Sequence, residues 1–425
     1  MPPQIGSATE TVQTRCCIAG GGPAGMIAGY LLARAGVDVV VLEKHADFLR
    51  DFRGDTIHPS TLELMHELGI LQDFLQRPHQ ELPQIGAQIE EFAVTVADFS
   101  HLSTQCKFTA LMPQWDFLNF VAGKAQAYPN FHLRMQTEVT GLIEEHGNIV
   151  GVRAITPRGS LAVRARLTIG ADGRRSIVRQ KAGFKVIDLG APIDVLWMRL
   201  SRQPGDPNQT LGRFHAGKIL VMLNRDEYWQ CAYVIAKDGF ELIQQKGLQA
   251  FRDDLAGVAP FLYGRTAELK EWNDVKLLSV AVDRLEQWSR EGLLCIGDSA
   301  HAMSPIGGVG INLAIQDAVA AANLLTQPLL QDNVTEEILR KVQERREFPT
   351  RMTQRLQVFG HKRAIGPALA ERGPIRQLPL PFRLLQKFPA LRRIPARVFG
   401  LGFRPEHVRS PRASNPAAAP DRGPR

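Results

Sequence analysis

Apolar and polar positions along the first 43 residues follow a strand–helix–strand order. Residues 15–19 form a short apolar run, a glycine-rich turn follows, and the next residues carry apolar side chains at helical spacing. A second apolar run, residues 39–42, ends in Glu43. This pattern predicts a βαβ unit over residues 14–43.

The rest of the chain shows two periodicities. Helical spacing predicts helices from residue 60 (behind a cap at Ser60 or Thr61) and over residues 116–128, 240–255, 309–325 and 335–359. Strand-forming runs predict strands within residues 86–112, 131–170, 193–235 and 293–298. The strands of 193–235 favour a mostly antiparallel sheet. After residue 404 the chain is rich in Pro, Ala, Arg and Ser, which predicts disorder.

Composition places the chain among ordinary globular proteins, because 44% of its 425 residues are hydrophobic and 22% are charged. Residues 1–14 lack the apolar stretch of a secretory signal, and no apolar run approaches the roughly 20 residues of a membrane span. The cysteines show neither metal-ligand nor disulfide spacing. We therefore expect no metal site and a cytoplasmic location.

The positive charge is concentrated at the C-terminal end. The formal net charge is +8, but after Thr350 sixteen Lys and Arg residues stand against three acids. Residues 1–350 are therefore net negative. No nucleic-acid motif and no interleaved Tyr or Trp accompany the cations, so we expect no nucleic-acid partner.

The glycine-rich turn has the spacing of a dinucleotide-binding loop. Gly20 permits a tight turn, Gly22 lets the backbone approach a pyrophosphate, and Gly25 allows close packing of helix on strand. The helix N-terminus offers free N–H groups to the phosphates. Glu43 lies about twenty residues on, where a carboxylate accepts hydrogen bonds from a ribose.

Two further motifs change the prediction from a dinucleotide to FAD. They are Thr168-Ile-Gly-Ala-Asp172-Gly-Arg-Arg-Ser176-Ile-Val-Arg179 and Cys295-Ile-Gly297-Asp298, which continues through His301 and Pro305 to Gly307-Gly308-Val-Gly310-Ile311-Asn312. With the first glycine motif, they make residues 14–345 resemble the class A flavoprotein monooxygenases, the para-hydroxybenzoate hydroxylase-like group. The resemblance implies non-covalent FAD, with NADH or NADPH as electron donor.

The resemblance implies an α/β fold: a Rossmann-like FAD-binding domain, an inserted, mostly antiparallel β-sheet substrate domain and a C-terminal helical segment. The FAD-binding domain is expected over residues 1–80, 113–185 and 286–345. The substrate domain is expected over residues 81–112 and 186–285. The helical segment would follow over 346–403, with a disordered basic tail over 404–425.

The resemblance also assigns site residues. Arg53, Asp172 and Pro305 are the expected catalytic group, close to the reactive part of the flavin or the cofactor cleft. Asp298 is expected to accept hydrogen bonds from ribityl hydroxyls. Residues expected to bind the cofactor are Gly20, Gly22, Pro23, Ala24, Gly25, Glu43, Lys44, Arg53, Gln114, Asp172, Gly297, Asp298, Pro305, Gly308, Gly310, Ile311 and Asn312.

The later glycines suggest how a flavin ring would be held. Gly307, Gly308 and Gly310 would leave room for a planar ring against the backbone. They lead into a helix expected at about residue 311, whose N-terminal N–H groups would stabilise negative charge on the N1/C2 carbonyl of reduced flavin.

Several of these residues have a simpler structural interpretation. Ser176 is equally suited to capping the next helix, and Arg53 to a loop ion pair with Asp51 or Asp55. His301 suits a packing or hydrogen-bonding role as well as general-base catalysis. The candidate substrate contacts, which core packing explains equally well, are Tyr228, Trp229 and Tyr233.

The reaction implied by the resemblance is hydroxylation by O₂ through a flavin C4a-hydroperoxide that the protein shields from water. The carboxylate-binding arginine and paired tyrosines of the family prototype have no clear counterpart within residues 218–235. We therefore expect a larger, more apolar aromatic or polycyclic substrate than a benzoate. The alternatives are a flavin-dependent epoxidase or halogenase, a dehydrogenase or reductase, and a non-enzymatic flavin-bound partner. A halogenase is disfavoured because the sequence has no Trp-x-Trp-x-Ile-Pro stretch.

Residues 382–403 mix apolar residues with cations. This composition suits peripheral contact with an anionic membrane. The alternative is that the apolar residues pack on the FAD-binding domain while the arginines stay solvated. The sequence leaves the oligomeric state open between monomer and homodimer.

Overall fold

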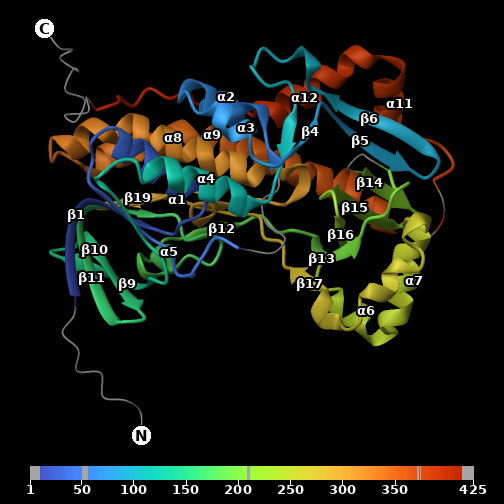
Figure 1. Ribbon diagram of the computed structural model, residues 1–425, viewed down its shortest axis with the longest axis horizontal. Helices are drawn as coiled ribbons and strands as arrows, with labels where there is room; N and C mark the ends of the chain where they lie inside the picture. The colour runs from blue at the N-terminus through green and yellow to red at the C-terminus, as the bar shows by residue number, and fades with distance from the viewer. Residues whose placement is uncertain (1–9, 50–55, 208–210, 371–372, 374, 414–425) are drawn as a thin grey trace, which may run out of the picture.

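The computed structural model describes residues 10–49, 56–207, 211–370, 373 and 375–413 (Figure 1). The larger sheet has the strand order β19-β20-β11-β1-β2-β8, in which β20, β11, β1, β2 and β8 are parallel neighbours. β10 pairs antiparallel with the first half of β11, and β9 pairs antiparallel with β10. The strands are β1 (Glu10–Ala19), β2 (Val39–Leu42), β8 (Phe131–Arg134), β9 (Glu138–Glu145), β10 (Asn148–Thr156), β11 (Gly159–Gly170), β19 (Ser289–Arg290) and β20 (Leu293–Cys295).

The register of this sheet brings the three sequence motifs together. Ala19 pairs with Gly170, and Gly170 pairs with Cys295, so β1, β11 and β20 end side by side. Each motif begins where one of these strands ends. In a parallel sheet, this carboxyl edge is where ligands bind.

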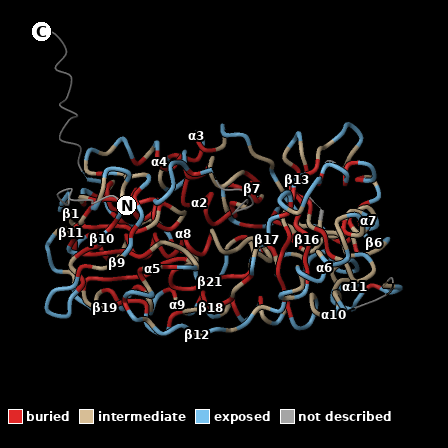
Figure 2. The backbone as a smooth tube through the Cα atoms, turned by 90° about the horizontal axis from the view of Figure 1, so that it is seen from below, coloured by how far each residue is buried: buried red, intermediate tan, exposed pale blue. Residues whose placement is uncertain are grey.

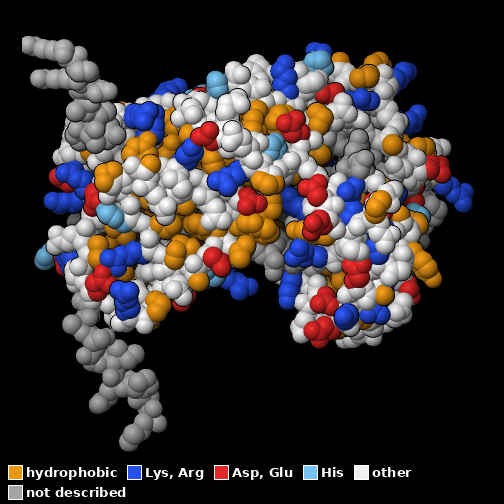
Figure 3. All heavy atoms as spheres, viewed as in Figure 1, with side chains coloured by type: hydrophobic (Ala, Val, Ile, Leu, Met, Phe, Trp, Pro, Cys, Tyr) orange, Lys and Arg blue, Asp and Glu red, His pale blue; other side chains and the backbone are white. Residues whose placement is uncertain are grey.

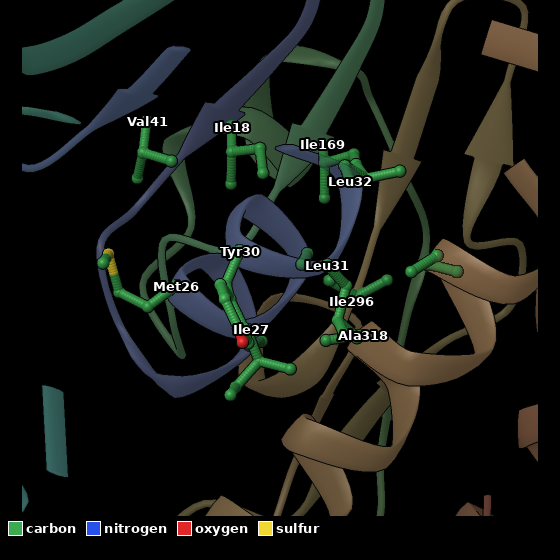
Figure 4. Close-up of a cluster of buried hydrophobic side chains, with 14 of the residues drawn as sticks. Ile18, Met26, Ile27, Tyr30, Leu31, Leu32, Val41, Ile169, Ile296 and Ala318 are labelled. Carbon is green, nitrogen blue, oxygen red and sulfur yellow. The ribbon is translucent and has the colours of Figure 1, made fainter. Parts of the chain in front are cut away.

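Helices cover the parallel sheet and form the main core with it. Figure 4 shows Ile18, Val41 and Ile169 of three strands beside Met26, Ile27 and Leu31 of α1, with Ala318 of α8 nearby. Figure 2 shows buried backbone running through this region and again around β13 and β16. The helices of this part are α1 (Pro23–Arg34), α2 (Pro59–Glu67), α3 (Leu71–Leu75), α4 (Gln114–Ala125), α5 (Ile177–Lys181), α8 (Val309–Leu330) and α9 (Glu336–Gly360).

One helical stretch, Ile306–Leu330, is long and apolar enough to cross a membrane, and 61% of its most apolar window is buried inside the protein. This stretch includes α8, which packs against α1 and α9. Core packing therefore accounts for its apolar character.

The second sheet has the order β17-β13-β16-β15-β14-β5-β6. All its neighbours are antiparallel except β14 and β5. Its strands are β5 (Gln84–Ile89), β6 (Phe92–Asp98), β13 (Ile193–Ser201), β14 (Leu211–His215), β15 (Lys218–Asn224), β16 (Tyr228–Ala236) and β17 (Lys276–Leu278). The expected α/β fold with a second, mostly antiparallel sheet is confirmed.

Two small sheets join these parts. One contains β3 (Thr56–Ile57), β7 (Thr109–Leu111) and β4 (Gln80–Leu82), and the other contains β12 (Val186–Asp188), β18 (Asp283–Leu285) and β21 (His301–Ala302).

Two helix predictions need correction. The single helix expected over 240–255 is two helices, α6 (Phe240–Lys246) and α7 (Leu248–Val258), because Gly247 between them has a φ of 90°. The helix expected from residue 60 begins at Pro59 behind His58, with no side-chain cap. Proline suits the first position of a helix because the N–H it lacks would have no partner there.

The C-terminal helices follow α9 through a π-helical turn, His361–Ile365. They are α10 (Gly366–Ala370), α11 (Leu380–Lys387) and α12 (Arg393–Gly400). α11 and α12 pack on β6 of the second sheet, where Ala396 and Phe399 join Ala97, Phe99 and Leu102. The segment therefore packs on the second sheet as well as on the FAD-binding part, where Phe399 lies beside Gly307 and His58.

Disorder from residue 404 onward is also wrong for residues 404–413. Glu406 is buried beside Arg345 and Arg346 of α9. The N–H of Ala413 donates to the carbonyl of Arg34 at 2.9 Å. The composition predicted disorder because this stretch has few apolar residues, but it is held by polar contacts to distant helices. Residues 414–425 lie outside the described residues.

Candidate functional site

The glycine turn after β1 is shaped by contacts within the protein. Gly20 has a φ of +108°, and a Cβ there would lie 2.4 Å from the carbonyl oxygen of Ala171. A Cβ at Gly25 would lie 2.0 Å from the carbonyl oxygen of Gly20. These two positions therefore require glycine for the packing of β1, β11 and α1.

Gly22 differs from its neighbours because the space beside it is open. It is the N-cap of α1 in an extended conformation, and a Cβ there would meet no atom within 4 Å. The first-turn N–H groups of a helix have no partner inside the helix. The open space in front of them is a cradle suited to a phosphate.

Glu43 braces this turn. Its Oε2 accepts the N–H of Gly21 at 2.9 Å, and its Oε1 accepts the N–H of His45 at 3.0 Å. Burial alone would raise the pKa of Glu43, but hydrogen bonds from His45 and Gly21 outweigh it and hold the pKa below its ordinary value. The ionised carboxylate holds the glycine turn and also lines the cavity.

Asp172 follows β11 and keeps one oxygen free. Its Oδ2 accepts the N–H of Val178 at 3.1 Å, whereas its Oδ1 is buried without a hydrogen-bond partner among the described residues. Burial raises the pKa of Asp172 despite the hydrogen bonds that oppose it. Ser176 Oγ accepts the N–H of Arg179 at 2.9 Å, so Ser176 caps α5.

Asp298 follows β20 and pairs with a cation. Its Oδ2 lies 3.1 Å from Nε of Arg174, and both side chains are partly exposed. This ion pair joins the loop after β11 to the loop after β20. Arg174 contacts Oδ2 of Asp298 and leaves Oδ1 of the carboxylate outside this ion pair.

The glycines before α8 fit against neighbouring residues of the chain. Gly308 has a φ of +61°, and a Cβ there would lie 2.1 Å from Oγ1 of Thr56. A Cβ at Gly307 would lie 2.7 Å from Cε1 of Phe399. The helix begins at Val309, where the helical spacing predicted it. These two glycines are required by Thr56 and Phe399, whatever room they also leave for a ring.

Asn312 fastens this loop to the start of α2. Its Oδ1 accepts the N–H of His58 at 2.9 Å and the hydroxyl of Thr61 at 2.8 Å. Its Nδ2 donates to the carbonyls of Thr56 and Gly308. These partners satisfy the Asn312 side chain from within the protein, so it shapes the site by holding backbone.

A single cavity of about 2010 Å³ collects most of the predicted site residues. The predicted residues that line it are Gly20, Gly22, Pro23, Ala24, Glu43, Lys44, Gln114, Asp172, Asp298, Pro305, Gly308, Gly310, Ile311 and Asn312. Gly25 and Gly297 are not in its lining. Arg53 lies outside the described residues.

Beyond Pro305 the cavity becomes apolar. Val195 and Trp197 of β13, Ile219 and Val221 of β15, and Val234 of β16 line it. Register pairs Val195 and Ile219 with Val234, so these side chains share one face of the sheet.

The predicted substrate contacts are not on this wall. Trp229 and Tyr233 lie on the opposite face of β16, where both belong to the core beside α7 with Phe251. Tyr228 does not line the cavity and instead stacks under Arg199, 3.9 Å from its ring centre. The alternation of side chains predicted which of these residues share a face of the sheet. It could not show which face the helices cover.

Residues of the C-terminal segment form a wall that the sequence prediction missed. Phe359, Arg363, Ala364, Phe382 and Ile394 line the cavity. Arg363 has no hydrogen-bond or ion-pair partner among the described residues and is exposed on the π-helical turn. The family resemblance ended before this segment, so it gave no signal for these residues.

His301 belongs to a buried network behind the cavity. Its Nε2 lies 2.5 Å from Oδ2 of Asp317, which also accepts the N–H of Gly297 at 3.1 Å. Arg346 donates to the other oxygen of Asp317 at 2.9 Å. Burial would raise the pKa of Asp317, but His301 and Arg346 hold it below its ordinary value. This geometry gives His301 a hydrogen-bonding role, in line with its simpler interpretation.

Comparisons with known proteins identify the family of the chain. Residues 13–356 match the FAD binding domain family. The chain is 34% identical to 6-methylpretetramide 4-monooxygenase of Streptomyces rimosus over 366 residues, which are 84% of this chain and 85% of that protein.

Solved structures show the same fold. The p-nitrophenol 4-monooxygenase of Pseudomonas putida matches with a TM-score of 0.75 and 18% identity over 92% of this chain and 98% of that chain. The myxobacterial chondrochloren halogenase matches with a TM-score of 0.72 and 18% identity over 94% of this chain and 95% of that chain. The chain belongs to the FAD binding domain family of class A flavin monooxygenases, and it is an FAD-dependent monooxygenase that hydroxylates an aromatic substrate.

Proposed function

We propose that this enzyme hydroxylates a large, apolar phenolic ring system, using non-covalently bound FAD, O₂ and NADH or NADPH. One observation carries the proposal: the same cavity runs from the three strand ends to the apolar face of the second sheet. A cofactor held at the strand ends would thus reach a substrate held against that sheet.

The residues present fit FAD. The open space at Gly22 would take the pyrophosphate, and Glu43 lies where it would accept hydrogen bonds from the ribose. Asp298 and Gln114 line the middle of the site, where the ribityl chain would lie. The unpartnered Oδ1 of Asp172 offers a further buried acceptor towards the cofactor cleft.

When bound, FAD supplies electron transfer from the nicotinamide and activation of O₂ for transfer to the ring. The protein's own residues bind, orient and exclude water. The N-terminus of α8 directs its N–H groups towards the site and favours negative charge there. The apolar side chains of β13, β15 and β16 keep water from the reacting atoms.

Arg363 supports a substrate with an acidic oxygen. Its guanidinium has no ion-pair partner within the part of the chain that the structure describes, and it lies on the C-terminal wall of a chamber lined mainly by apolar side chains. A phenolate or enolate oxygen would complement it. The relative from Streptomyces rimosus carries 6-methylpretetramide in its name, and a ring system of that kind is our first candidate.

The remaining assignments are also proposals. The chain shows a single dinucleotide fingerprint, so we infer that NAD(P)H binds transiently at the surface. We also propose a cytoplasmic location. Arg53, Asp172 and Pro305 stay proposed catalytic positions, and the domain division up to residue 403 stays a proposal.

The decisive experiment measures NADH and NADPH oxidation together with O₂ uptake across a panel of polycyclic phenols. We expect the reduced nicotinamide and O₂ to be consumed only when substrate is present. When the O₂ is isotopically labelled, one labelled oxygen atom should appear in the product. Turnover with an artificial acceptor but not O₂ would indicate a dehydrogenase and overturn the proposal.

The same fold occurs in a halogenase, so halide dependence is the second arm of this experiment. We expect the product to carry oxygen whether or not chloride or bromide is present. A halogenated product that forms only with an added reductase would overturn the monooxygenase assignment.

A further inference from the structure

We propose that the outer face of α11 and α12 docks on an anionic phospholipid bilayer and presents the mouth of the substrate cavity to it. The surface, here called the C-terminal patch, is defined by five exposed apolar residues. They are Leu380, Leu384, Phe388, Leu391 and Ile394, with exposed fractions of 63%, 40%, 49%, 37% and 64%.

The apolar residues of α11 form a stripe that faces away from the protein. Leu380 and Leu384 are four residues apart, so they lie on one side of the helix, and the exposed Phe388 follows directly after its last residue. Phe382 points the other way and packs with Leu378 against β5 and β6. α11 therefore has two apolar sides. One is buried against the second sheet, and the other has no partner in the described chain.

Cations alternate with these apolar residues along the sequence. Residues 375–405 contain Arg376, Arg383, Lys387, Arg392, Arg393, Arg397 and Arg404, and no Asp or Glu. Figure 3 shows hydrophobic and basic side chains side by side at the corner where Figure 1 places α11 and α12. Apolar side chains ringed by Lys and Arg are the composition that binds the interface of anionic membranes.

The patch is continuous with the cavity. Ile394 belongs to the patch and also lines the cavity. Pro381, at the start of α11, lines the cavity next to the patch residue Leu380. Phe359 at the end of α9 is 62% exposed and lines the same cavity. A bilayer seated on the patch would therefore touch the rim through which an apolar substrate enters.

Charge argues against the other apolar partner, a second copy of this chain. A symmetric dimer through the patch would bring two sets of cations together without an acid between them. The lipid headgroups of an anionic bilayer would neutralise those cations, and its interface would bury the apolar side chains. The inference stands on binding alone and does not depend on the proposed substrate.

The test is flotation of the full-length holoenzyme with two kinds of vesicle, phosphatidylcholine mixed with phosphatidylglycerol and phosphatidylcholine alone. We expect flotation with the anionic vesicles only, and release at high salt because salt screens exposed charges. Leu384→Asp combined with Lys387→Gln should lower the vesicle affinity by at least about tenfold, or about 1.4 kcal/mol.

The matched control is Leu242→Asp combined with Lys246→Gln on α6. Leu242 is 63% exposed and neither residue lines the cavity. We expect the control to float like the wild type, and both variants to keep their bound FAD and melting temperature.

Three results would overturn the proposal. They are absence from both vesicle fractions, an equal loss in the control, and a dimer in solution that the patch variant dissociates. Capture by an acidic protein without vesicle binding would assign the patch to that partner instead.

Discussion

Gly22 is the residue whose side chain would act on the ligand and not on the fold. Its extended backbone accepts any residue, and a Cβ there meets no protein atom. We therefore expect Gly22→Val to fold normally but to lose FAD affinity by at least about tenfold, or about 1.4 kcal/mol. The ratio of flavin absorbance to protein in the purified enzyme measures this.

Gly123→Ala is the control for this change. Gly123 lies on α4, and a Cβ there also meets nothing within 4 Å. Its FAD content should equal that of the wild type. Full FAD occupancy in Gly22→Val would remove the pyrophosphate from this position.

Arg363 should act on substrate and leave the cofactor alone. Replacing it by Gln removes the charge that would pair with an acidic oxygen, so the substrate Kd should rise by about tenfold, or about 1.4 kcal/mol. Lys362→Gln, next to it on the same turn and outside the cavity lining, is the control. Equal substrate titrations for both variants would leave Arg363 as an ordinary surface cation.

Local residues were predictable where the motif makes its own contacts. Gly25 packs on the carbonyl of Gly20, Asp172 accepts the N–H of Val178, and Gly20 packs on Ala171 at the neighbouring strand end, which the sheet aligns with it. Gly307 and Gly308 are required because they pack against Phe399 and Thr56, which are far away in the sequence. The motif therefore located these glycines but could not show which contacts require them.

At the scale of elements, His58 makes the start of α2 sensitive to acid. It is buried, its Nδ1 lies 2.6 Å from the carbonyl oxygen of Phe399, and burial lowers its pKa to about 4. The unfolded chain binds a proton near pH 6.5 that the folded chain does not. Stability is therefore full above about pH 6.5 and falls by up to about 3 kcal/mol as pH drops towards 4.

His58→Asn should flatten this part of the profile. Urea unfolding between pH 4 and 7 measures it, with His66→Asn on the exposed side of α2 as control. An unchanged slope in His58→Asn would show that other groups carry the acid sensitivity.

Faces of elements were harder to predict than the elements themselves. The period of β16 placed Trp229 and Tyr233 together, but only the packing of α7 decides that they are core. In the same way, helical spacing found residues 240–255 but not the break that Gly247 makes.

At the scale of the whole molecule, residues 404–413 tie the end of the chain to the buried network. Arg346 lies between Asp317 at 2.9 Å and Glu406 at 3.4 Å, and all three are buried. A chain that ends at residue 403 leaves Arg346 with one carboxylate fewer. We expect it to lose about 3 kcal/mol of stability, because a buried charge without its partner is costly.

A chain that ends at residue 413 is the control. It keeps Glu406 and the hydrogen bond from Ala413 to Arg34, so its unfolding free energy should match the full chain. Equal stability of both truncations would mean that the Glu406 contacts contribute nothing measurable.

The C-terminal wall lies beyond the part of the chain that matches the family, so one wall of the substrate chamber is encoded apart from the strand ends that would hold the cofactor. A lineage can therefore acquire a new substrate by rewriting residues 357–398 while the three strand ends stay untouched. Three residues must be kept. Gln357 and His361 hydrogen-bond Ser304 beside Pro305, and Phe399, just beyond this stretch, contacts Gly307 with its ring and His58 with its carbonyl. Grafting residues 357–398 between relatives, with Gln357, His361 and Phe399 retained, should alter selectivity.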